Sequence, residues 1–324
     1  MNILLTCVGR RVSLLESFRT ALGDLGLQGR VLGADRTSLA PGFQAADEGF
    51  LVPTAAGPDY VQALLDICRR QRVALVIPLI DWELATIAAA RESFAAAGTR
   101  AVVSDLRVVE ICRDKRRTFE FLKAAGLATP EIFTYEEAVG KPFPLFMKPR
   151  FGSSAKDVHP LPDREALEFY YPRAAESVIQ EYVQGTEYTV DVYAGFDGVP
   201  RVAVPRQRLE VRGGEVSKAR TVRHEGVMRD CTRLVEKMRQ CAGVVTIQCF
   251  VDAAGEIKII EMNPRFGGGV PLAIRAGANF PRWLIEEHLG RRPLIAPDGW
   301  TEDLVMLRYD AEVFRRWGDF AGNP

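Results

Sequence analysis

The sequence has few histidines, no closely spaced cysteine pair and no excess of either charge, and each absence narrows the class of protein. Lysine plus arginine and aspartate plus glutamate each number 42 in 324 residues. The resulting net charge of zero argues against broad electrostatic binding to nucleic acid. The three histidines, His159, His224 and His288, are too scattered to predict a histidine metal site. None of the six cysteines forms a Cys-x-x-Cys pair, so we expect reduced thiols in a cytoplasmic protein.

Long apolar runs are also missing. No run approaches the length that a membrane-spanning helix needs, so no membrane partner is expected. The apolar start breaks at Arg10 and Arg11 without a cationic stretch before it, which argues against a signal peptide. The first turn, CVGRRVS, lacks the Gly-x-Gly-x-x-Gly pattern, which counts against an NAD-binding dehydrogenase. What remains is a chain with 47% hydrophobic residues and room for two or three domains.

The first third of the chain alternates strand-like and helix-like patterns. Strands are expected at Ile3–Cys7, Val31–Ala34, Gly49–Val52, Ala74–Leu79 and Arg100–Val103, and helices at Val12–Leu22, Tyr60–Arg70 and Glu83–Ala97. This alternation predicts a parallel, doubly wound sheet. Asp81 and Glu83 follow the fourth strand, where ligands of such sheets bind. Asp81 could equally be the N-cap of the next helix.

From Arg113 onward the pattern changes to helices and antiparallel strands. A helix from Arg113 to Gly126 is followed by a strand ending at Lys148, a Gly-Ser turn and a second strand. Such a hairpin can fold over phosphates, although an ordinary hairpin has the same pattern. Alternating strands then flank an Asp197-Gly198 turn, and a long helix is expected to stop at Gly243. We expect three domains, at residues 1–113, 114–184 and 185–324.

The most informative segment is KIIEMNPRFGGG, from Lys258 to Gly269. Strand alternation puts Glu261, Asn263 and Arg265 on one side if the strand continues that far. Carboxylate and amide oxygens suit Mg²⁺, and the guanidinium fork suits phosphate or carboxylate oxygens. The spacing therefore predicts a site that handles Mg-nucleotide and moves a phosphoryl group.

Taken together, these segments resemble the ATP-grasp superfamily, and most closely single-copy relatives of the carbamoyl-phosphate synthetase large chain and biotin carboxylase. The linear order of the motifs, rather than any single motif, carries the resemblance, which covers roughly Asn2 to Gly290. It implies an α/β N-terminal doubly wound parallel-sheet domain followed by an α+β ATP-grasp fold. It also implies ATP with Mg²⁺ or Mn²⁺, and allows a homodimer.

The resemblance assigns expected roles residue by residue. The nucleotide is expected to contact Lys115, Lys148, Ser153 and Ser154 of the phosphate-covering loop, Glu181 and Val183 of the adenine hinge, and Glu187 at the ribose. Magnesium is expected on Gln248, Glu261 and Asn263. Lys148 and Arg265 are the expected catalytic residues, and Arg265 would stabilise a phosphorylated intermediate.

The implied reaction is ATP-dependent ligation of a carboxylic acid to an amine through an acyl phosphate. Candidate substrate contacts are Arg206, Arg220, Asp81 and Gly268, the last in a glycine run expected to leave room for the acid. Surface charge is the plain alternative for the arginines. Two other readings stay open: phosphorylation of bicarbonate or carbamate, and a nucleotide-binding regulatory subunit without turnover.

Overall fold

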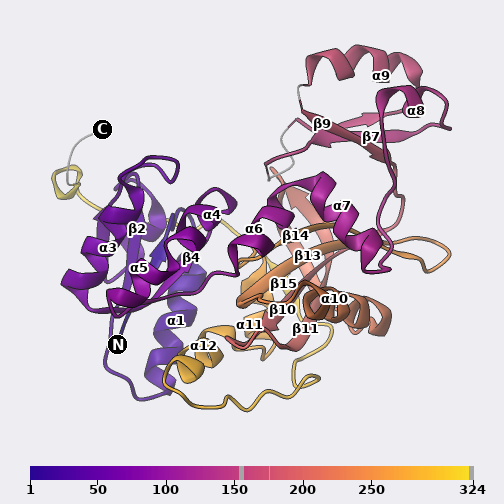
Figure 1. The fold of residues 1–324 in the computed structure, drawn as a ribbon. Coiled ribbons are helices and arrows are strands. Elements are labelled where there is room, and N and C mark those ends of the chain that lie inside the picture. Colours follow the sequence, from indigo (N-terminus) through magenta and orange to yellow (C-terminus); the bar gives the residue numbers. More distant parts are fainter. Residues whose placement is uncertain (153–156, 175, 321–324) are drawn as a thin grey trace.

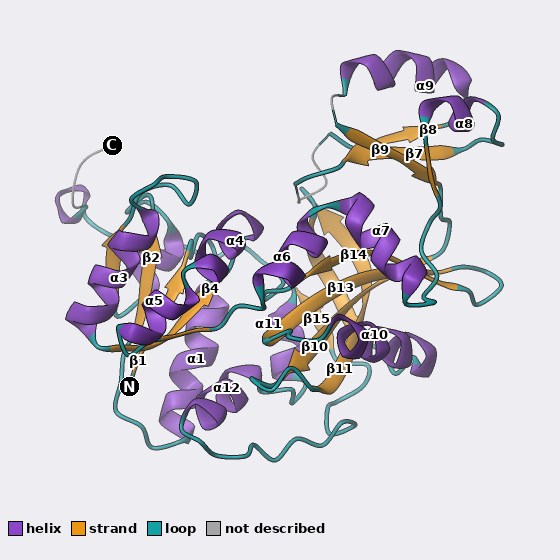
Figure 2. Cartoon of the chain, viewed as in Figure 1, coloured by secondary structure: helices purple, strands orange, loops and turns teal. Residues whose placement is uncertain are grey.

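The computed structural model describes residues 1–152, 157–174 and 176–320. Its described strands form three sheets of five, four and six strands, and the smallest sheet stands apart from the other two (Figure 1). The N-terminal sheet and the six-stranded sheet lie side by side, with helices packed around both (Figure 2). These three sheets define the N-terminal domain, the small lobe and the large subdomain of the description that follows.

The N-terminal domain is a parallel sheet in the order β3-β2-β1-β4-β5. Its elements are β1 (Asn2–Thr6), α1 (Val12–Asp24), β2 (Val31–Asp35), α2 (Pro41–Ala45), β3 (Glu48–Leu51), α3 (Tyr60–Gln71), β4 (Val73–Pro78), α4 (Asp81–Ala89), α5 (Arg91–Ala96) and β5 (Arg100–Ala101). Successive residues of β1 enter different cores, Ile3 and Leu5 on the side of α1 and Leu4 on the side of α3. The expected doubly wound sheet is therefore confirmed.

Three helix boundaries differ from expectation. The single helix expected at Glu83–Ala97 is divided at Ala90, where the backbone turns to φ −96° and ψ 9° with no glycine or proline to mark the break. The helix expected from Arg113, α7 (Lys115–Ala124), begins after Asp114, whose carboxylate accepts the Arg116 N–H at 3.0 Å and so caps it. The long helix stops at Met238 because Arg239 has φ +55°, ahead of Gly243.

The small lobe is an antiparallel sheet in the order β6-β9-β7-β8. It contains β6 (Ile132–Phe133), α8 (Tyr135–Val139), β7 (Leu145–Pro149), β8 (His159–Leu161), α9 (Arg164–Tyr170), the short 3₁₀ helix η1 (Tyr171–Arg173) and β9 (Ser177–Glu181). Its core is separate and small, with Ala138, Leu145, Met147, Leu161, Leu167 and Ile179 buried together. In Figure 1 it projects from the body with α8 and α9 on its outer side.

The large subdomain is built on a sheet in the order β14-β13-β10-β11-β12-β15. Its elements are β10 (Thr186–Ala194), β11 (Pro200–Arg212), β12 (Glu215–Thr221), α10 (Glu225–Met238), β13 (Gly243–Val251), β14 (Ile257–Asn263), α11 (Val270–Arg275), α12 (Phe280–His288) and β15 (Val305–Leu307). The short 3₁₀ helix η2 (Trp317–Asp319) instead lies beside the N-terminal domain, where Arg315 Nη2 donates to Gln44 O at 2.8 Å (Figure 1). Even-numbered residues of β10, such as Val190 and Val192, pack against α10. Odd-numbered residues such as Glu187 and Asp191 therefore point to the opposite face.

Helices α6 (Leu106–Arg113) and α7 lead from the N-terminal domain into the rest of the chain. The expected domain boundaries put α7 in the small lobe. Instead Leu122 of α7 is buried in the same core as Leu234 of α10 and Ile247 of β13. The apolar face of α7 needs a core to cover it, and it finds one on the large subdomain.

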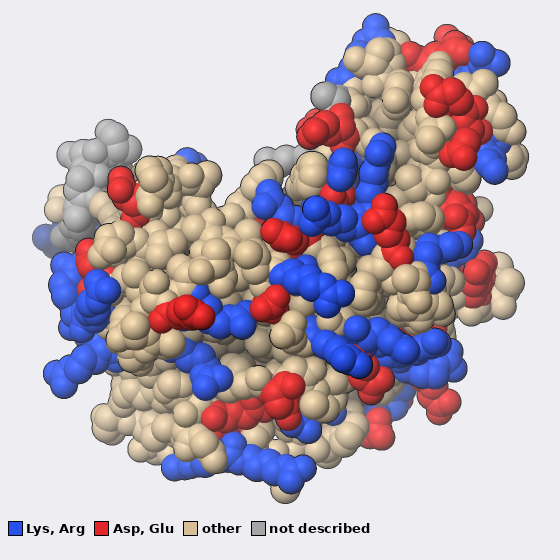
Figure 3. Space-filling view, viewed as in Figure 1, with Lys and Arg blue, Asp and Glu red and all other residues tan. Residues whose placement is uncertain are grey.

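Lysines and arginines alternate with acidic residues over the visible face, without a broad field of one sign (Figure 3). This distribution agrees with the equal numbers of basic and acidic residues. No helix in the described part of the chain has the length and apolar character to cross a membrane.

Candidate functional site

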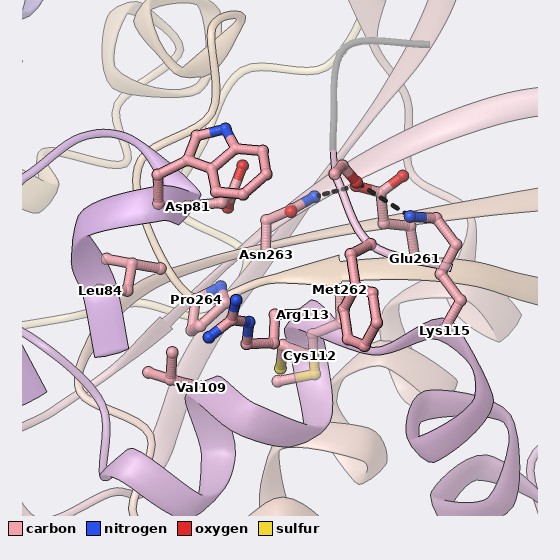
Figure 4. Close-up of a pocket in the computed structure, with 13 residues that line it drawn as sticks. Asp81, Leu84, Val109, Cys112, Arg113, Lys115, Glu261, Met262, Asn263 and Pro264 are labelled. Atoms are coloured by element: carbon pink, nitrogen blue, oxygen red, sulfur yellow. Dashed lines mark hydrogen bonds between the residues drawn. The ribbon is translucent and has the colours of Figure 1, made fainter. Parts of the chain in front are cut away.

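A cleft of about 860 Å³ runs between the small lobe and the polar face of the six-stranded sheet. It is in the range of about 300–1,000 Å³ that small-molecule sites occupy. Residues from all three parts line it, including Arg11, Lys148 and Glu261. A smaller cavity of about 30 Å³ adjoins it beside Asp81, Lys115 and Asn263 (Figure 4).

Strand β14 brings Glu261 and Asn263 to the cleft on one face, because the strand continues through Asn263. Asn263 Nδ2 donates to Glu261 Oε1 at 2.9 Å (Figure 4). Across the antiparallel pair with β13, Gln248 lies opposite Glu261 and Thr246 opposite Asn263. The three residues predicted to bind magnesium are therefore brought together by strand register.

The donor set at this point suits Mg²⁺ that is held partly by a nucleotide. The described residues contain no group of three or more His, Cys, Asp or Glu side chains able to hold a metal alone. Glu261 offers one carboxylate, and Asn263 and Gln248 offer amide oxygens. Mg²⁺ is commonly held by one or two carboxylates plus substrate phosphates, so these side chains fit that mode.

Both predicted nucleotide lysines reach the cleft, and in the described structure each donates to a backbone carbonyl. Lys115 Nζ donates to Gly152 O at 2.9 Å, and Lys148 Nζ to Ile260 O at 3.3 Å. Burial lowers the pKa of Lys148 to about 8, and the nearby Lys115 opposes the pull of Glu261. Burial likewise lowers the pKa of Lys115. An anionic phosphate would supply the negative charge that these ammonium groups lack.

The predicted adenine hinge follows β9. Val183 and Glu181 line the cleft. The Glu181 carboxylate is already held by Lys258 Nζ at 2.5 Å, an ion pair that the sequence did not predict. The predicted loop contacts Ser153 and Ser154 lie outside the described residues.

Glu187 is held from two neighbouring strands. Its Oε1 accepts Arg208 Nη1 at 2.6 Å and Gln248 Nε2 at 3.1 Å. The predicted ribose acid and the predicted third metal position thus share one hydrogen-bonded group on the polar sheet face.

Arg265 lies just beyond β14 and donates from Nη2 to Asp81 Oδ2 at 2.8 Å. Burial opposes its charge, but Asp81 and then Glu261 raise the pKa of Arg265 above its usual value. The N-cap of α4 is Ile80, so the alternative that Asp81 is the cap is wrong. Asp81 therefore connects the N-terminal domain to Arg265, the predicted catalytic arginine.

Glu83 does not reach the cleft, contrary to the expectation that it faces a substrate. It is completely buried, and its Oε1 accepts the N–H groups of Leu79 and Ile80 at 2.8 and 3.1 Å. Tyr60 donates to its other oxygen. The carboxylate therefore caps α4 from within the domain.

Arg206, predicted as a substrate contact, borders the cleft but is buried, so the alternative that it is a surface charge is wrong. It is 1% exposed and forms a two-bond ion pair with Asp191 at 2.7 and 3.1 Å. Its Nη1 has no hydrogen-bond partner in the described structure, although the residue borders the cleft. Asp191 on the neighbouring strand thus fixes the Arg206 guanidinium, and only its Nη1 group lacks an acceptor among the described residues.

The glycine run was expected to leave empty room for the acid substrate, but it does not. A Cβ on Gly269 would lie 2.1 Å from Arg206 Nη1, and one on Gly268 would lie 2.8 Å from Arg11 Nη1. A Cβ on Gly267 would lie 2.8 Å from Thr246 Oγ1. The glycines are small because the protein's own side chains pack against them, while all three still line the cleft.

Arg220 lies on the wrong face for a substrate contact, which corrects the prediction. In the pairing of β11 with β12, Arg220 lies opposite Gln207, and Thr221 lies opposite Arg206. Arg220 Nε donates to Gln207 at 2.8 Å and Nη1 to Asp303 at 3.2 Å. The register shifts at Glu210 cancel, so Gln207 and Arg220 stay in step with the Arg212–Glu215 pair beside the turn. The pairing with β11, which alternation within β12 alone does not report, puts Arg220 on this face.

Arg11 was not predicted as a site residue. It follows β1 and immediately precedes α1, and it lines the cleft beside Gly268. One signal in the sequence could have identified it, because residues after the carboxyl ends of parallel strands commonly face ligands.

Comparison with known proteins agrees with this arrangement. A model described as an ATP-grasp domain matches residues 112–269, and one described as a PylC-like N-terminal domain matches residues 3–102. The chain therefore contains an ATP-grasp domain, and the domain that precedes it is PylC-like. The predicted family and fold class are confirmed.

The curated relatives are much longer than this chain. The carbamoyl phosphate synthase large chain of Thermoanaerobacter sp. (strain X514) is 21% identical over 295 residues, which are 84% of this chain and 27% of the relative. The chain therefore spans about a quarter of the length of that relative.

Two solved structures share the fold at low identity. The biotin carboxylase domain of Hydrogenobacter thermophilus 2-oxoglutarate carboxylase, in complex with MgADP and bicarbonate, has TM-score 0.73 and 16% identity, covering 94% of this chain and 73% of that one. The L-amino acid ligase of Bacillus licheniformis has TM-score 0.69 and 19% identity, covering 89% and 74%.

Proposed function

We propose that the chain is an ATP- and Mg²⁺-dependent ligase that joins a carboxylic acid to an amine through an acyl phosphate. The observation that carries the proposal is the pairing of two kinds of group in one cleft. Two lysine ammonium groups donate only to backbone carbonyls in the described structure, next to the Glu261–Asn263 pair. Cations without carboxylate hydrogen-bond partners, beside hard oxygen ligands, suit a metal-bound polyphosphate.

In this proposal Lys115 and Lys148 bind the phosphates of the nucleotide substrate, and Glu181 and Glu187 border its other end. Glu261 and Asn263, with Gln248, would hold Mg²⁺, which neutralises the charge that develops on the transferred phosphoryl group. Lys148 and the hinge belong to the small lobe, whereas Lys115 and the metal-binding pair lie with the large subdomain, so nucleotide binding would draw the two parts together.

Arg265 would orient the acid and stabilise charge on the acyl phosphate. Its ion pair with Asp81 fixes one side of the guanidinium fork. The acid's carboxylate oxygen attacks the γ-phosphorus and ADP leaves. The amine nitrogen then attacks the acyl carbon, and phosphate leaves as the amide forms. Asp81, only partly buried, is the group proposed to meet the amine.

The test is release of ADP by the purified chain over a panel of paired acids and amines. Acid-dependent release, with a hydroxamate trapped when hydroxylamine replaces the amine, is the expected result. Turnover with no hydroxamate from any accepted acid would contradict the acyl phosphate. Tight ATP binding with no turnover over the whole panel would favour a regulatory subunit instead.

A second candidate is phosphorylation of bicarbonate or carbamate. The bicarbonate in the H. thermophilus structure and the carbamoyl phosphate synthase name of the relative favour it. ADP release that depends on bicarbonate and needs no organic acid would select this reaction over amide formation.

A further inference from the structure

Arginines gather at the end of the cleft that lies beyond the metal-binding pair. Four guanidinium groups meet three carboxylates there: Arg11, Arg206, Arg265 and Arg308 with Asp81, Asp191 and Glu215. Three of the arginines are paired, Arg206 with Asp191, Arg265 with Asp81 and Arg308 with Glu215. The cluster therefore has one more guanidinium than carboxylates.

Arg11 is the arginine without a direct partner. Its side chain makes no hydrogen bond or close ion pair with the part of the chain that the structure describes, and Glu215 acts on it only at longer range. Burial, against the pull of Glu215 and with a smaller contribution from Arg265 and Arg308, lowers the pKa of Arg11 to about 10. The group stays charged at neutral pH and is only partly buried.

Two arginines without a full set of partners in the described structure lie at this end of the cleft. Arg11 borders the cleft, and Gly268 has no side chain that would displace its Nη1, since a Cβ there would lie 2.8 Å away. Arg206 also borders the cleft, 1% exposed and with Nη1 unpartnered in the described structure. A buried donor without an acceptor has lost its hydrogen bonds to water, and a bound anion would restore a partner.

Arg11 lies at the glycine run rather than at the metal-binding pair. A Cβ on Gly268 would lie 2.8 Å from Arg11 Nη1 and 3.6 Å from Glu215 Oε2. Glu261 and Asn263 instead lie opposite Gln248 and Thr246 on the neighbouring strand. The place of Arg11 therefore suits a part of the substrate that does not react.

We propose that the acid substrate carries a second anionic group, a carboxylate or a phosphate-like group, which Arg11 binds from the N-terminal domain as the specificity-determining contact. This inference rests on the proposed ligase function. An amine substrate is disfavoured at this position because the arginine excess repels an ammonium group. Guanidinium forks bind carboxylate and phosphate oxygens in the same two-bond geometry, so both chemistries belong to the proposal.

The first experiment measures equilibrium binding by calorimetry in Mg²⁺ and a non-hydrolysable ATP analogue. The probes are succinate, glutarate and 3-phosphonopropionate, each compared with a monoanion: succinamate for succinate and 3-phosphonopropionate, and glutaramate for glutarate. We expect at least one dianion to bind about 10–100-fold more tightly than its matched monoanion, as for a charge-assisted hydrogen-bonded pair. Binding of no dianion, or equal binding of dianion and monoanion, would overturn the proposal. The carboxylate and phosphonate arms distinguish the two anion chemistries.

Three variants locate the effect. Arg11→Gln should abolish the preference for the dianion while leaving affinity for the half-amide and for the nucleotide within about twofold. Gly268→Ala should reduce the preference by displacing the guanidinium. Arg10→Gln is the matched control, because Arg10 is 81% exposed and reaches Glu215 only at 3.8 Å. A preference that survives Arg11→Gln would overturn the assignment.

A structural role for Arg11 predicts something different. If Arg11 only neutralises Glu215, the double variant Arg11→Gln with Glu215→Gln should regain the preference for the dianion. We expect no recovery. Should Arg11→Gln fail to fold, Arg11→Lys keeps the charge and removes the fork, and it should retain only part of the preference.

Turnover separates this inference from the proposed function. ADP release with monoanionic acids alone would leave the ligase function intact and overturn the anion site. Dianion binding that depends on Arg11, with no ADP release from any acid, would leave the anion site intact and contradict the ligase function.

Discussion

The two ends of the cleft hold their cations in different ways. At the end bordered by the small lobe, Lys115 and Lys148 donate to the carbonyls of Gly152 and Ile260. At the other end, Arg206 and Arg265 are paired with Asp191 and Asp81. The lysines keep their charge available to an outside anion, whereas most of the arginines have theirs neutralised within the protein.

This difference shows that a basic residue in a cleft can serve either ligand binding or the stability of the fold. A buried ammonium that lacks a carboxylate partner carries a desolvation cost, which a ligand can relieve. A buried guanidinium in a two-bond carboxylate pair has already been compensated, so its loss is felt first in folding. The following changes test that division, beginning with the largest expected effect.

Glu261→Ala should lower kcat by about 10³-fold or more, because metal-bound charge stabilisation contributes several kcal/mol to the transition state. The measurement is ADP release with a substrate that the wild-type protein turns over. Glu256→Ala is the matched control, since Glu256 lies on the same hairpin with its side chain 52% exposed. Near-wild-type turnover in Glu261→Ala would remove Glu261 from the proposed metal site.

Asp191→Ala should lower the free energy of unfolding by about 3–5 kcal/mol, because it leaves the buried Arg206 guanidinium uncompensated. Chemical denaturation followed by circular dichroism measures the change. The double variant Asp191→Leu with Arg206→Met removes both charges and should recover most of the stability. A loss below about 1 kcal/mol in the single variant would place Arg206 among the ligand-directed cations.

Lys148 should make nucleotide binding depend on pH. Its pKa of about 8 in the free protein should rise when an anionic phosphate binds, so Mg-nucleotide binding takes up a proton at and above this pH. Affinity should fall roughly tenfold for each pH unit above that value. Calorimetry in two buffers of different ionisation enthalpy measures the uptake. Lys148→Arg should abolish it, and the exposed Lys141→Arg should not.

Lys148 should also make the free energy of unfolding depend on pH, and here the contribution should rise with pH whereas nucleotide affinity falls. Its pKa is lowered on folding, so the unfolded chain holds this proton more firmly. Without nucleotide, the contribution of Lys148 to the free energy of unfolding should therefore rise between about pH 8 and the normal lysine pKa of about 10.4. Denaturation of wild-type protein and Lys148→Met over this range checks the sign. A contribution that falls with pH would contradict a buried, uncompensated ammonium.

Arg220→Gln should change the acid KM by less than about twofold, the smallest effect expected here, because surface ion pairs contribute about 0–1 kcal/mol. Its guanidinium contacts Gln207 and Asp303 on the face away from the cleft. A large rise in the acid KM would show that the outer face of β12 takes part in binding.

The features that could be predicted from the sequence are those set by the local pattern of residues along one strand or one strand-helix unit. Alternation put Glu261 and Asn263 on one face, and β14 extends far enough to keep them there. The alternation of strand-like and helix-like segments likewise predicted the doubly wound N-terminal sheet, whose central strand β1 sends side chains into a core on each face.

What the sequence could not predict depends on contacts between distant segments. Arg265 meets Asp81, 184 residues away, and no local pattern reports that distance. The face of Arg220 depends on which residues of β11 it lies beside, and alternation within β12 alone does not say which side meets the cleft. The role of the glycine run was misjudged because the side chains that fill its space, Arg11 and Arg206, come from other parts of the chain.

The division of the hydrophobic cores has a consequence for how the molecule opens. Phe18 of α1 shares one core with Tyr193 of β10 and Phe280 of α12, and Phe18 stacks edge-on against Phe266 at 5.9 Å. The N-terminal domain and large subdomain should therefore lose their amide-exchange protection together. The small lobe has a separate core of six fully buried residues and should exchange at lower free energy. One wall of the cleft can thus unfold locally while the other keeps the metal-binding strand in register.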